Sequence, residues 1–527
     1  MSPHSSRELL PRRASFRPHE PIAIEVRGAV AAGPARVFHL GELVAEIDWR
    51  GGDLLLPALA EGGYGVELDG LGTAVEVAAE PRRRLRYGFV ASYAPDKDIG
   101  GVVDMVRRLH LTGVQFYDWA YRHADLMGGG ESYRDALDQP IALATVRALV
   151  GAVQQAGSRA LGYAAVYAVG PKEWDRWQHQ ALVTATGTPY GLGDFLFILD
   201  PAAPDWLRHF TADLAASTAA LGFDGYHLDQ YGYPRRAQRA DGVAVDVGAS
   251  FVTLIDAVRE ALPAAHLVFN NVNDFPTRRS AASRQDAVYI EPWAPQLTLQ
   301  HLADTVTRAR GFGGDKPVVL AAYQHIYDTA PAEAADRATA LTMATLFSHG
   351  GTQLLAGEAD RLLCDPYYVR NHVMAASTAA LLKRWYDFLV VHDALLMPPE
   401  LTDVTNAYAG PYNNELDVSY AGAGLSETAA AGTVWRRIVA NGDQVIVHLI
   451  NLTAQSDTLW DAARAAPGEV GAGTLRFRLS GTRPPRVRVA DPDAGGRLTD
   501  VAVRADGDFA EAVLPALAVW QVVLVEG

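Results

Sequence analysis

The chain has 527 residues, of which 49% are hydrophobic and 20% are charged, and its net charge is −15 at pH 7. This length exceeds one ordinary hydrophobic core, so two to four domains are expected. The negative charge argues against nucleic acid and anionic membrane as partners, because both attract positive surfaces. No apolar run of the sequence approaches the ~18 residues of a membrane-spanning helix.

The start of the chain and its cysteine content bear on the cellular compartment. The first 21 residues contain four arginines but no apolar core beyond Leu9 and Leu10, which is not typical of a secretory signal. The single cysteine, Cys364, excludes an internal disulfide and fits a reducing compartment. We therefore expect a cytoplasmic protein, although a chain trimmed at its start would look the same.

Both ends of the chain have the pattern of antiparallel β-sandwiches. Within residues 1–85, short β-type runs alternate with Gly/Pro turns: Ile22–Val26, Ala35–His39, Leu43–Ile47 and Ala74–Ala78. This predicts an N-terminal β-sandwich of immunoglobulin type. Residues 406–527 become β-rich again and predict a C-terminal antiparallel sandwich, with strands at Trp435–Ala440, Gln444–Asn451, Thr474–Leu479 and Ala518–Val525.

The middle of the chain, residues 86–405, alternates β-type runs with long amphipathic helical stretches. Eight strands are expected: Tyr87–Tyr93, Gly113–Trp119, Ala160–Tyr167, Gly225–Gln230, His266–Val272, Ala287–Trp293, Pro317–Tyr323 and Thr352–Gly357. Eight such alternations over roughly 300 residues are the pattern of a (β/α)8 TIM barrel. The fold class expected is thus an α/β multidomain protein, in which the two sandwiches flank a central barrel.

One stretch, Gly222–Gly232, indicates where the chemistry of this barrel lies. It predicts a short buried strand that ends at Asp229 and is followed by Gln230. A carboxylate at the C-terminal end of a barrel strand is typical of a catalytic group. The alternative is that Asp229 caps a helix or pairs with an arginine.

The ends of the other strands carry further polar and aromatic side chains. Because the C-terminal ends of barrel strands share one face, we expect these residues to line one cavity: Tyr117, Asp118, Trp119, His123, Tyr163, His227, Asn270, Asn271, Tyr289, Glu291, Trp293, Tyr323 and Glu358. Aromatic faces pack on the C–H faces of sugars, while carboxylates and amides bind hydroxyl groups. Asp229 and Glu291 supply the two carboxylates that glycoside hydrolysis needs.

Several of these residues also have a purely structural interpretation. Asp118 could pair with Arg122, His123 could be a structural histidine, His227 could be a core residue and Glu358 could be a solvated loop residue. Trp174 and Trp177, in the long segment after the third strand, could pack within that loop rather than form a sugar platform. The sequence contains no metal-binding or nucleotide-binding motif of the usual types, so neither a metal nor another cofactor is expected.

Five motifs, in order and spacing, resemble glycoside hydrolase family 66: Tyr87–Phe89, Gln115–Trp119 followed by Arg122 and His123, Phe223–Gln230, Phe269–Asn273 and Tyr289–Trp293. That family contains endo-dextranases and cycloisomaltooligosaccharide glucanotransferases. The resemblance implies a barrel between two β-domains and retention of anomeric configuration on α-1,6-glucans. It assigns the nucleophile to Asp229 and the acid/base to Glu291.

The sequence therefore predicts a retaining hydrolase of α-1,6-glucosidic linkages in dextran or isomaltooligosaccharides. Two alternatives stay open: a transglycosylase that forms cyclic or rearranged isomaltooligosaccharides, and a catalytically inactive glucan-binding protein. Hydrolysis and transfer begin with the same glycosyl-enzyme and differ only in what attacks it. Polymer or oligosaccharide substrate, endo or exo action and oligomeric state are not decided by the sequence.

Overall fold

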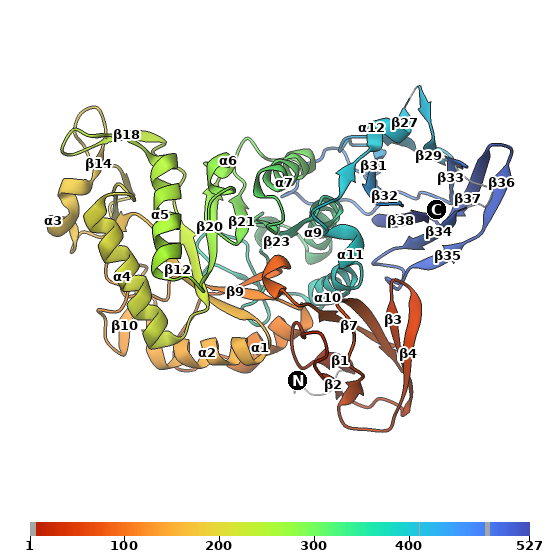
Figure 1. Ribbon diagram of the computed structural model, residues 1–527, viewed down its shortest axis with the longest axis horizontal. Helices are drawn as coiled ribbons and strands as arrows, with labels where there is room; N and C mark the ends of the chain where they lie inside the picture. The colour runs from red at the N-terminus through yellow and green to blue at the C-terminus, as the bar shows by residue number, and fades with distance from the viewer. Residues whose placement is uncertain (1–6, 411, 480–484) are drawn as a thin grey trace.

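The centre of the molecule is a parallel β-sheet of eight strands surrounded by helices (Figure 1). The computed structural model describes residues 7–410, 412–479 and 485–527. The eight strands follow one another in chain order and every neighbouring pair is parallel: β8 (Tyr87–Val90), β9 (Gly113–Phe116), β12 (Arg159–Ala165), β17 (Gly225–Asp229), β20 (His266–Val272), β21 (Ala287–Glu291), β22 (Val318–Leu320) and β23 (Gly351–Gln353). All eight predicted strands are present, although most end earlier than the sequence predicted.

The sheet curls until its first and last strands meet. The backbone N–H of Phe89 donates to the carbonyl of Ala356 at 3.2 Å, and Thr352 Oγ1 donates to the carbonyl of Leu85 at 3.0 Å. Along β12 the side chains of Leu161 and Tyr163 join a core cluster inside the sheet, whereas their neighbours join the larger cluster beneath the helices. The strands are thus buried on both faces, as in a (β/α)8 barrel.

Seven long helices, among the described residues, pack around this sheet or beside it: α1 (Ile99–Arg108), α2 (Leu143–Gln155), α4 (Pro204–Leu221), α5 (Val247–Ala261), α7 (Leu299–Gly313), α9 (Ala332–Ser348) and α10 (Ala376–Val391). Helix α4 shows how local sequence sets the position of a strand. It begins at Pro204; proline lacks a backbone N–H, but an N–H in the first turn of a helix has no partner within the helix, so nothing is lost. The helix ends at Leu221 and is capped by Gly222, whose φ is +78°. The chain then enters β17, which carries Asp229 at its end.

The N-terminal strands form two antiparallel sheets that share one hydrophobic cluster. One sheet has the order β1 (Glu8–Pro11), β2 (Ile22–Arg27) and β5 (Leu54–Leu56). The other has the order β4 (Glu42–Trp49), β3 (Gly33–His39), β6 (Gly62–Leu68) and β7 (Leu71–Val77). Helix α10 packs against β6 and β7, so these sheets rest directly on the barrel.

The C-terminal strands also form two sheets around a cluster of their own, antiparallel except where β30 runs parallel to β31. The larger sheet contains β30 (Gly424–Ser426), β26 (Thr402–Asp403), β31 (Thr433–Asn441), β32 (Gln444–Asn451), β38 (Trp520–Glu526), β34 (Arg486–Ala490) and β35 (Thr499–Val501). The smaller contains β29 (Leu416–Tyr420), β33 (Gly473–Arg478), β37 (Phe509–Leu514) and β36 (Val503–Asp506). Both sets of terminal sheets lie on the same side of the barrel (Figure 1).

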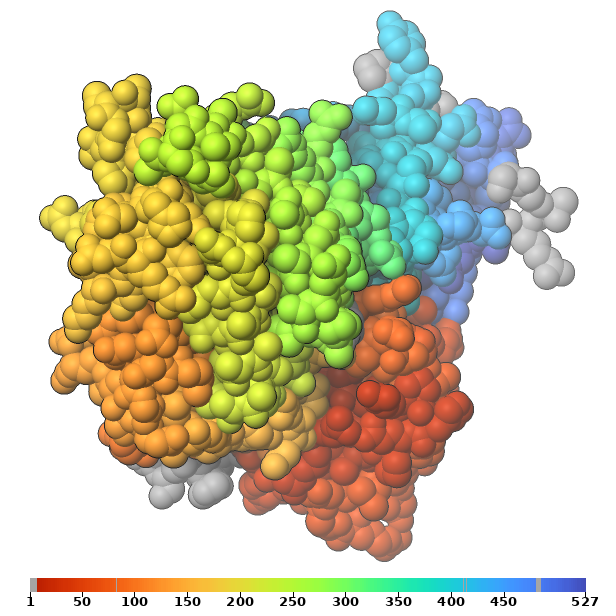
Figure 2. All heavy atoms as spheres, turned by 60° about the vertical axis from the view of Figure 1, so that its left-hand side comes forward, coloured from red at the N-terminus to blue at the C-terminus, as the bar shows by residue number. Residues whose placement is uncertain are grey.

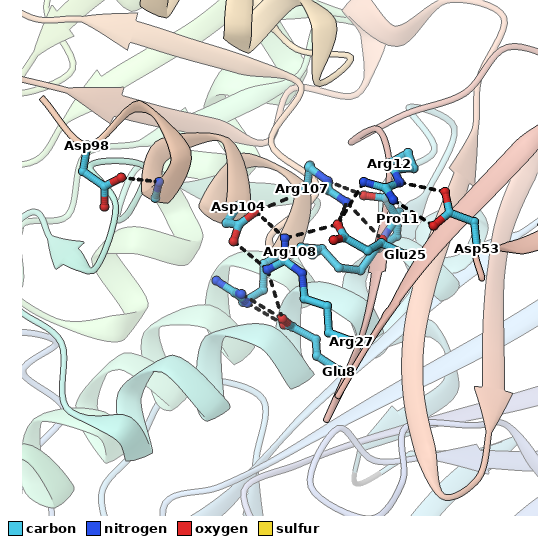
Figure 3. A network of polar contacts seen from close by, with 12 residues as sticks. Glu8, Pro11, Arg12, Glu25, Arg27, Asp53, Asp98, Asp104, Arg107 and Arg108 are labelled. Carbon is cyan, nitrogen blue, oxygen red and sulfur yellow. Dashed lines mark hydrogen bonds and ion pairs between the residues drawn. The ribbon is translucent and has the colours of Figure 1, made fainter. Parts of the chain in front are cut away.

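Ion pairs join the N-terminal sheets to the barrel, as Figure 3 shows around helix α1. Arg107 of α1 contacts Glu25 at 2.6 Å and donates to the carbonyl of Pro11 at 2.7 Å, and Arg108 contacts Glu8 at 2.6 Å. A further pair, Arg86–Glu76 at 2.7 Å, joins the start of the barrel to β7 and is almost completely buried. The N-terminal sheets and α1 are therefore held together by charge as well as by apolar packing.

Insertions after β12 and β17 build a small lobe at the opposite end of the molecule (Figures 1 and 2). The first insertion contains β13 (Ala168–Val169), α3 (Trp174–Trp177), β14 (Leu182–Val183), β15 (Gly191–Leu192) and β16 (Leu196–Ile198), and the second contains β18 (Arg236–Arg239) and β19 (Ala244–Asp246). Strand β14 pairs with β18, so one sheet joins both insertions. Trp174 packs on Phe197 and Trp177 packs on Trp206, which agrees with loop packing.

Candidate active site

Two carboxylates lie close together at the C-terminal ends of β17 and β21, held by one amide between them. Asn270 of β20 donates through Nδ2 to Oδ1 of Asp229 at 2.7 Å and to Oε2 of Glu291 at 2.9 Å. The two oxygens therefore cannot be farther apart than these two bond lengths together. Tyr163 of β12 donates through its hydroxyl to Oδ2 of Asp229 at 2.7 Å, so both oxygens of Asp229 accept a hydrogen bond.

The pKa values of these two carboxyl groups are raised. Burial, together with the nearby charge of Asp229, raises the pKa of Glu291 to about 7, against the opposing hydrogen bond from Asn270. Burial also raises the pKa of Asp229, while hydrogen bonds from Tyr163 and Asn270 oppose this shift because they favour the ionised form. Since two close carboxylates resist double ionisation, Asp229 is the better placed to hold the charge and Glu291 to hold the proton.

A third carboxyl group, that of Asp118, lies near this pair. Its backbone is left-handed, with φ +43°, which is uncommon for a residue other than glycine. Burial, and then the charges of Asp135 and Asp229, raise its pKa well above the usual range. The ion pair with Arg122 that the sequence allowed is not formed: Arg122 donates to the carbonyl of Arg134 at 2.9 Å and lies over the ring of Tyr121. Burial and the neighbouring carboxylates therefore favour the protonated, neutral form of Asp118, which can donate a hydrogen bond.

The carboxyl groups open into a cavity of about 260 Å³ with aromatic walls. Tyr117 stacks on Tyr368 with ring centroids 4.2 Å apart, and Trp293, which is 36% exposed, lies next to Tyr323 at the opening. No lining residue from the described parts of the chain is a lysine or an arginine. A cavity with aromatic walls, carboxyl groups and no cationic side chain suits a neutral polyhydroxylated ligand.

Eleven of the fifteen residues that the sequence assigned to the site line this cavity: Tyr117, Asp118, His123, Tyr163, His227, Asp229, Gln230, Asn270, Glu291, Trp293 and Tyr323. Burial lowers the pKa of His123 to about 4 and that of His227 to about 3, so both are neutral near pH 7. The ring of His227 also packs against Tyr87 and Tyr163. Gln230 donates to the carbonyls of Asn270 and Phe275, which supports the loop after β17.

Four of the assigned residues lie outside the cavity lining, and each has a structural partner. Asn271 donates to the carbonyls of Phe269 and Tyr289 and accepts from Ser280. Trp119 donates to the carbonyl of Tyr163 at 3.1 Å, and Tyr289 is buried with its hydroxyl 3.1 Å from that of Tyr368. Glu358 is not solvated but buried, in an ion pair with Lys97. The expected direct contacts of these four with a ligand are therefore not supported by their positions.

Sequence reasoning also missed several lining residues from loops. Tyr367 and Tyr368 follow β23 by more than ten residues, and Leu192 and Phe195 come from the insertion after β12. A run of two tyrosines after the eighth strand was the available signal, because loops at this face supply site residues. Within the described ranges, no group of three or more His, Cys, Asp or Glu side chains is arranged to hold a metal ion, and no helix is both long and apolar enough to cross a membrane.

A barrel with paired carboxylates at the C-terminal ends of its fourth and sixth strands has the design of a glycosidase-type site. The model of glycosyl hydrolase family 66 matches residues 55–524. The chain therefore belongs to this family.

Comparison with individual proteins agrees with this family. The chain is 25% identical over 392 residues to a cycloisomaltooligosaccharide glucanotransferase of Niallia circulans, covering 64% of this chain and 40% of that protein. It is 24% identical over 249 residues to a dextranase of Streptococcus salivarius, covering 40% of this chain and 30% of that protein. The chain thus spans less than half the length of these curated relatives.

Solved structures show the same fold. A cycloisomaltooligosaccharide glucanotransferase from Paenibacillus sp., complexed with cycloisomaltoheptaose, superposes with a TM-score of 0.86 at 18% identity, covering 99% of both chains. An α-amylase from Geobacillus thermoleovorans, complexed with acarbose, gives a TM-score of 0.53 at 14% identity, covering 85% of this chain and 99% of the amylase. The likeness to the first structure extends to the terminal sheets, since nearly the whole chain is covered.

Proposed function

We propose that this protein is a retaining glycoside hydrolase that cleaves α-1,6-glucosidic linkages through a covalent glycosyl-enzyme. The observation that carries this proposal is the amide of Asn270, bonded at once to Asp229 and Glu291. Because one nitrogen bonds both groups, the bridged oxygens lie close together, which supports the short separation of about 5–5.5 Å that retention requires; inverting enzymes need roughly 6.5–9.5 Å to admit a water molecule.

In the first step, ionised Asp229 attacks the anomeric carbon while protonated Glu291 gives its proton to the departing glycosidic oxygen. The bond from the anomeric carbon to that oxygen breaks, and a β-linked glucosyl ester forms on Asp229. A pKa of about 7 keeps much of Glu291 protonated near neutral pH. Hydrogen bonds from Tyr163 and Asn270 keep the nucleophile in position.

In the second step, the now ionised Glu291 removes a proton from water, whose oxygen attacks the anomeric carbon and releases Asp229. Two inversions leave the product in the α configuration. If the hydroxyl of another sugar takes the place of water, the same step forms a new linkage. A transglycosylase that makes cyclic or rearranged isomaltooligosaccharides is therefore the second candidate.

The choice of α-1,6-glucan follows from the relatives. One relative is named a dextranase, and another is named a cycloisomaltooligosaccharide glucanotransferase. A solved structure of a protein with the latter name contains cycloisomaltoheptaose. Because both carboxyl groups are present and bridged, we set aside the inactive glucan-binding protein. Chromatography of the products from dextran, isomaltooligosaccharides and α-1,4-glucans separates hydrolysis from transfer and defines the linkage.

The roles of the two carboxylates are tested with α-glucosyl fluoride, whose leaving group needs little protonation. We expect Glu291→Ala to be glycosylated by it, and azide to release the sugar as the α-glucosyl azide. Azide acting on Asp229→Ala should instead displace fluoride directly and give the β-azide. The opposite anomers would exchange the two roles, and unimpaired activity of both variants on α-1,6-glucan would refute the mechanism.

We further infer that the terminal sheets are separate β-sandwich domains, the first of immunoglobulin type, with boundaries near residues 85 and 405. Each set of sheets has a hydrophobic cluster of its own, although Ile446, Ile450 and Trp520 of the larger C-terminal sheet also join the barrel cluster. No catalytic group is assigned to them, since every residue of the proposed mechanism comes from the barrel.

A further inference from the structure

A second cavity adjoins the first on the side of the inserted lobe. Its volume is about 240 Å³, and it shares His123, Phe195 and Leu196 with the catalytic cavity. Its other walls are Arg122, Ala136 and residues 170–173. We name this space the side cavity. The shared residues make the two cavities neighbours along one continuous wall.

The side cavity lies across Asp229 from the proton donor. Its walls come from the loops after β9 and β12, whereas Glu291 ends β21. Around the closed sheet, β9 lies opposite β21, and the shorter path from β12 to β21 passes through β17, which carries Asp229. The proton donor must stand beside the departing oxygen, so the leaving portion of a chain extends toward Glu291. The portion that stays on the nucleophile extends toward the side cavity.

The walls of the side cavity fit a neutral sugar. Phe195 and Leu196 supply apolar surface, and Lys172 and Arg122 supply hydrogen-bond donors; Arg122 has no ion pair with a carboxylate in the described ranges. The Oε2 atom of Glu173 is buried without a hydrogen-bond partner there. A guanidinium donor and a carboxylate acceptor over an apolar surface are the groups that sugar hydroxyls and C–H faces require.

We propose that the side cavity binds the glucose units of the non-reducing portion of the substrate, beyond the unit held at Asp229. This inference rests on the proposed function, because it assumes an α-glucan chain in the catalytic cavity. It gives the chain a direction: the non-reducing end lies under the inserted lobe, and the reducing end leaves past Glu291 and Trp293. It also makes Glu173 and Arg122 determinants of where a chain is cut.

Ala136→Trp tests this direction, because it fills the side cavity from a wall that the catalytic cavity does not share. Ala32→Trp, at an exposed position between β2 and β3, is the matched control. The substrate is isomaltohexaose labelled at its reducing end, with products taken at early times. With fewer glucose units held on the non-reducing side, Ala136→Trp should cut nearer the non-reducing end and give longer labelled fragments than Ala32→Trp.

Glu173→Gln provides a second, smaller change that leaves the size of the side chain almost the same. We expect kcat/KM on isomaltohexaose to fall about tenfold, while kcat/KM on α-glucosyl fluoride stays within twofold of the wild type. The inference would be overturned if Ala136→Trp gave the same labelled fragments as Ala32→Trp, or shorter ones. Failure of the wild type to cut any isomaltooligosaccharide would instead overturn the proposed function.

Discussion

Buried or half-buried carboxylates occur in two regions of this molecule, and their pKa values move in opposite directions. Where the N-terminal sheets meet the barrel, burial of Glu25 is outweighed by hydrogen bonds from Arg27 and Arg107, which lower its pKa to about 2. Burial of Glu76 is likewise outweighed by Arg86, and its pKa is lowered. In the catalytic cavity no lysine or arginine of the described chain lines the wall, and burial raises the pKa values of Asp229, Glu291 and Asp118.

In these two regions, a neighbouring cation therefore distinguishes the carboxylates that hold the structure together from those proposed to take part in chemistry. A paired carboxylate is fixed in its ionised form, so it cannot take up or give a proton near neutral pH. An unpaired one is costly to bury but can exchange its proton. Neutralising a carboxylate that is paired with a cation should therefore lower stability, whereas neutralising an unpaired buried carboxylate should leave stability unchanged or raise it.

The largest effect is expected for Asp229→Asn, which keeps the size of the side chain but removes the proposed nucleophile. The rate on α-1,6-glucan should fall by about four orders of magnitude or more. The melting temperature should stay the same or rise, because an unpaired buried charge is lost. Initial rates and thermal unfolding check both parts; a large fall in melting temperature would contradict the comparison.

For Glu291→Gln we expect a rate on α-1,6-glucan lower by roughly 10²–10⁴, the usual contribution of general acid catalysis. Hydrolysis of α-glucosyl fluoride should be much less affected in its first step. In the proposed mechanism the acid form of Glu291 acts, so activity of the wild type should decline as pH rises through about 7. That decline should be missing from the pH profile of the variant, and its persistence would assign the titration to another group.

Glu76→Gln probes the other region. It leaves the guanidinium of Arg86 buried without its countercharge, which should lower the free energy of unfolding by about 3–5 kcal/mol. Activity per folded molecule should not change. Chemical denaturation measures the loss, with Glu46→Gln as control, because its ion pair with Arg36 is exposed and should contribute less than about 1 kcal/mol. Equal losses in the two variants would show that burial of the pair does not matter.

The same pair predicts how stability depends on pH. The folded-state pKa of Glu76 is lowered, so its stabilisation is fully present above the unfolded-state value of ~4.3. It is lost as pH falls through the lower folded-state pKa. Acid should therefore destabilise the wild type more than Glu76→Gln in this range, as measured by denaturation at a series of pH values.

The smallest change is expected in the pH profile of Asn270→Ala. Its hydrogen bond lowers the pKa of Glu291, so its removal should shift the alkaline limb of kcat/KM to higher pH, by about one unit or less. A pH–rate profile on isomaltooligosaccharides measures this shift. A move to lower pH would mean that the amide does not stabilise the ionised form.

The sequence allowed the barrel and the two central carboxylates to be predicted, because both follow from regular spacing. Strand ends on a barrel share one face, so Asp229, Asn270 and Glu291 could be placed together without coordinates. Asn270 and Asn271 were both predicted to line the cavity, but only one of them can, since adjacent residues of a strand point to opposite faces. The structure directs Asn270 to the cavity and Asn271 to Ser280.

Residues outside the regular elements could not be placed in this way. The sequence does not show that Lys97, in the loop before α1, reaches Glu358 and makes it a structural residue. Nor does it show that the loop after β23 returns Tyr368 to stack on Tyr117. Such contacts depend on loop paths, for which no periodicity in the sequence exists.

The lack of lysine and arginine around the catalytic cavity also affects how a ligand arrives. The chain carries a net charge of −15, and the cavity adds carboxyl groups without a compensating cation. A neutral glucan feels little of this field, so its association rate should hardly respond to ionic strength. A sugar that carries phosphate or carboxylate would be repelled before contact, and the repulsion would weaken as salt is added. The net charge of the chain would thus favour an uncharged ligand at a distance, whereas Arg122 and Lys172 of the adjoining side cavity act only close to the site.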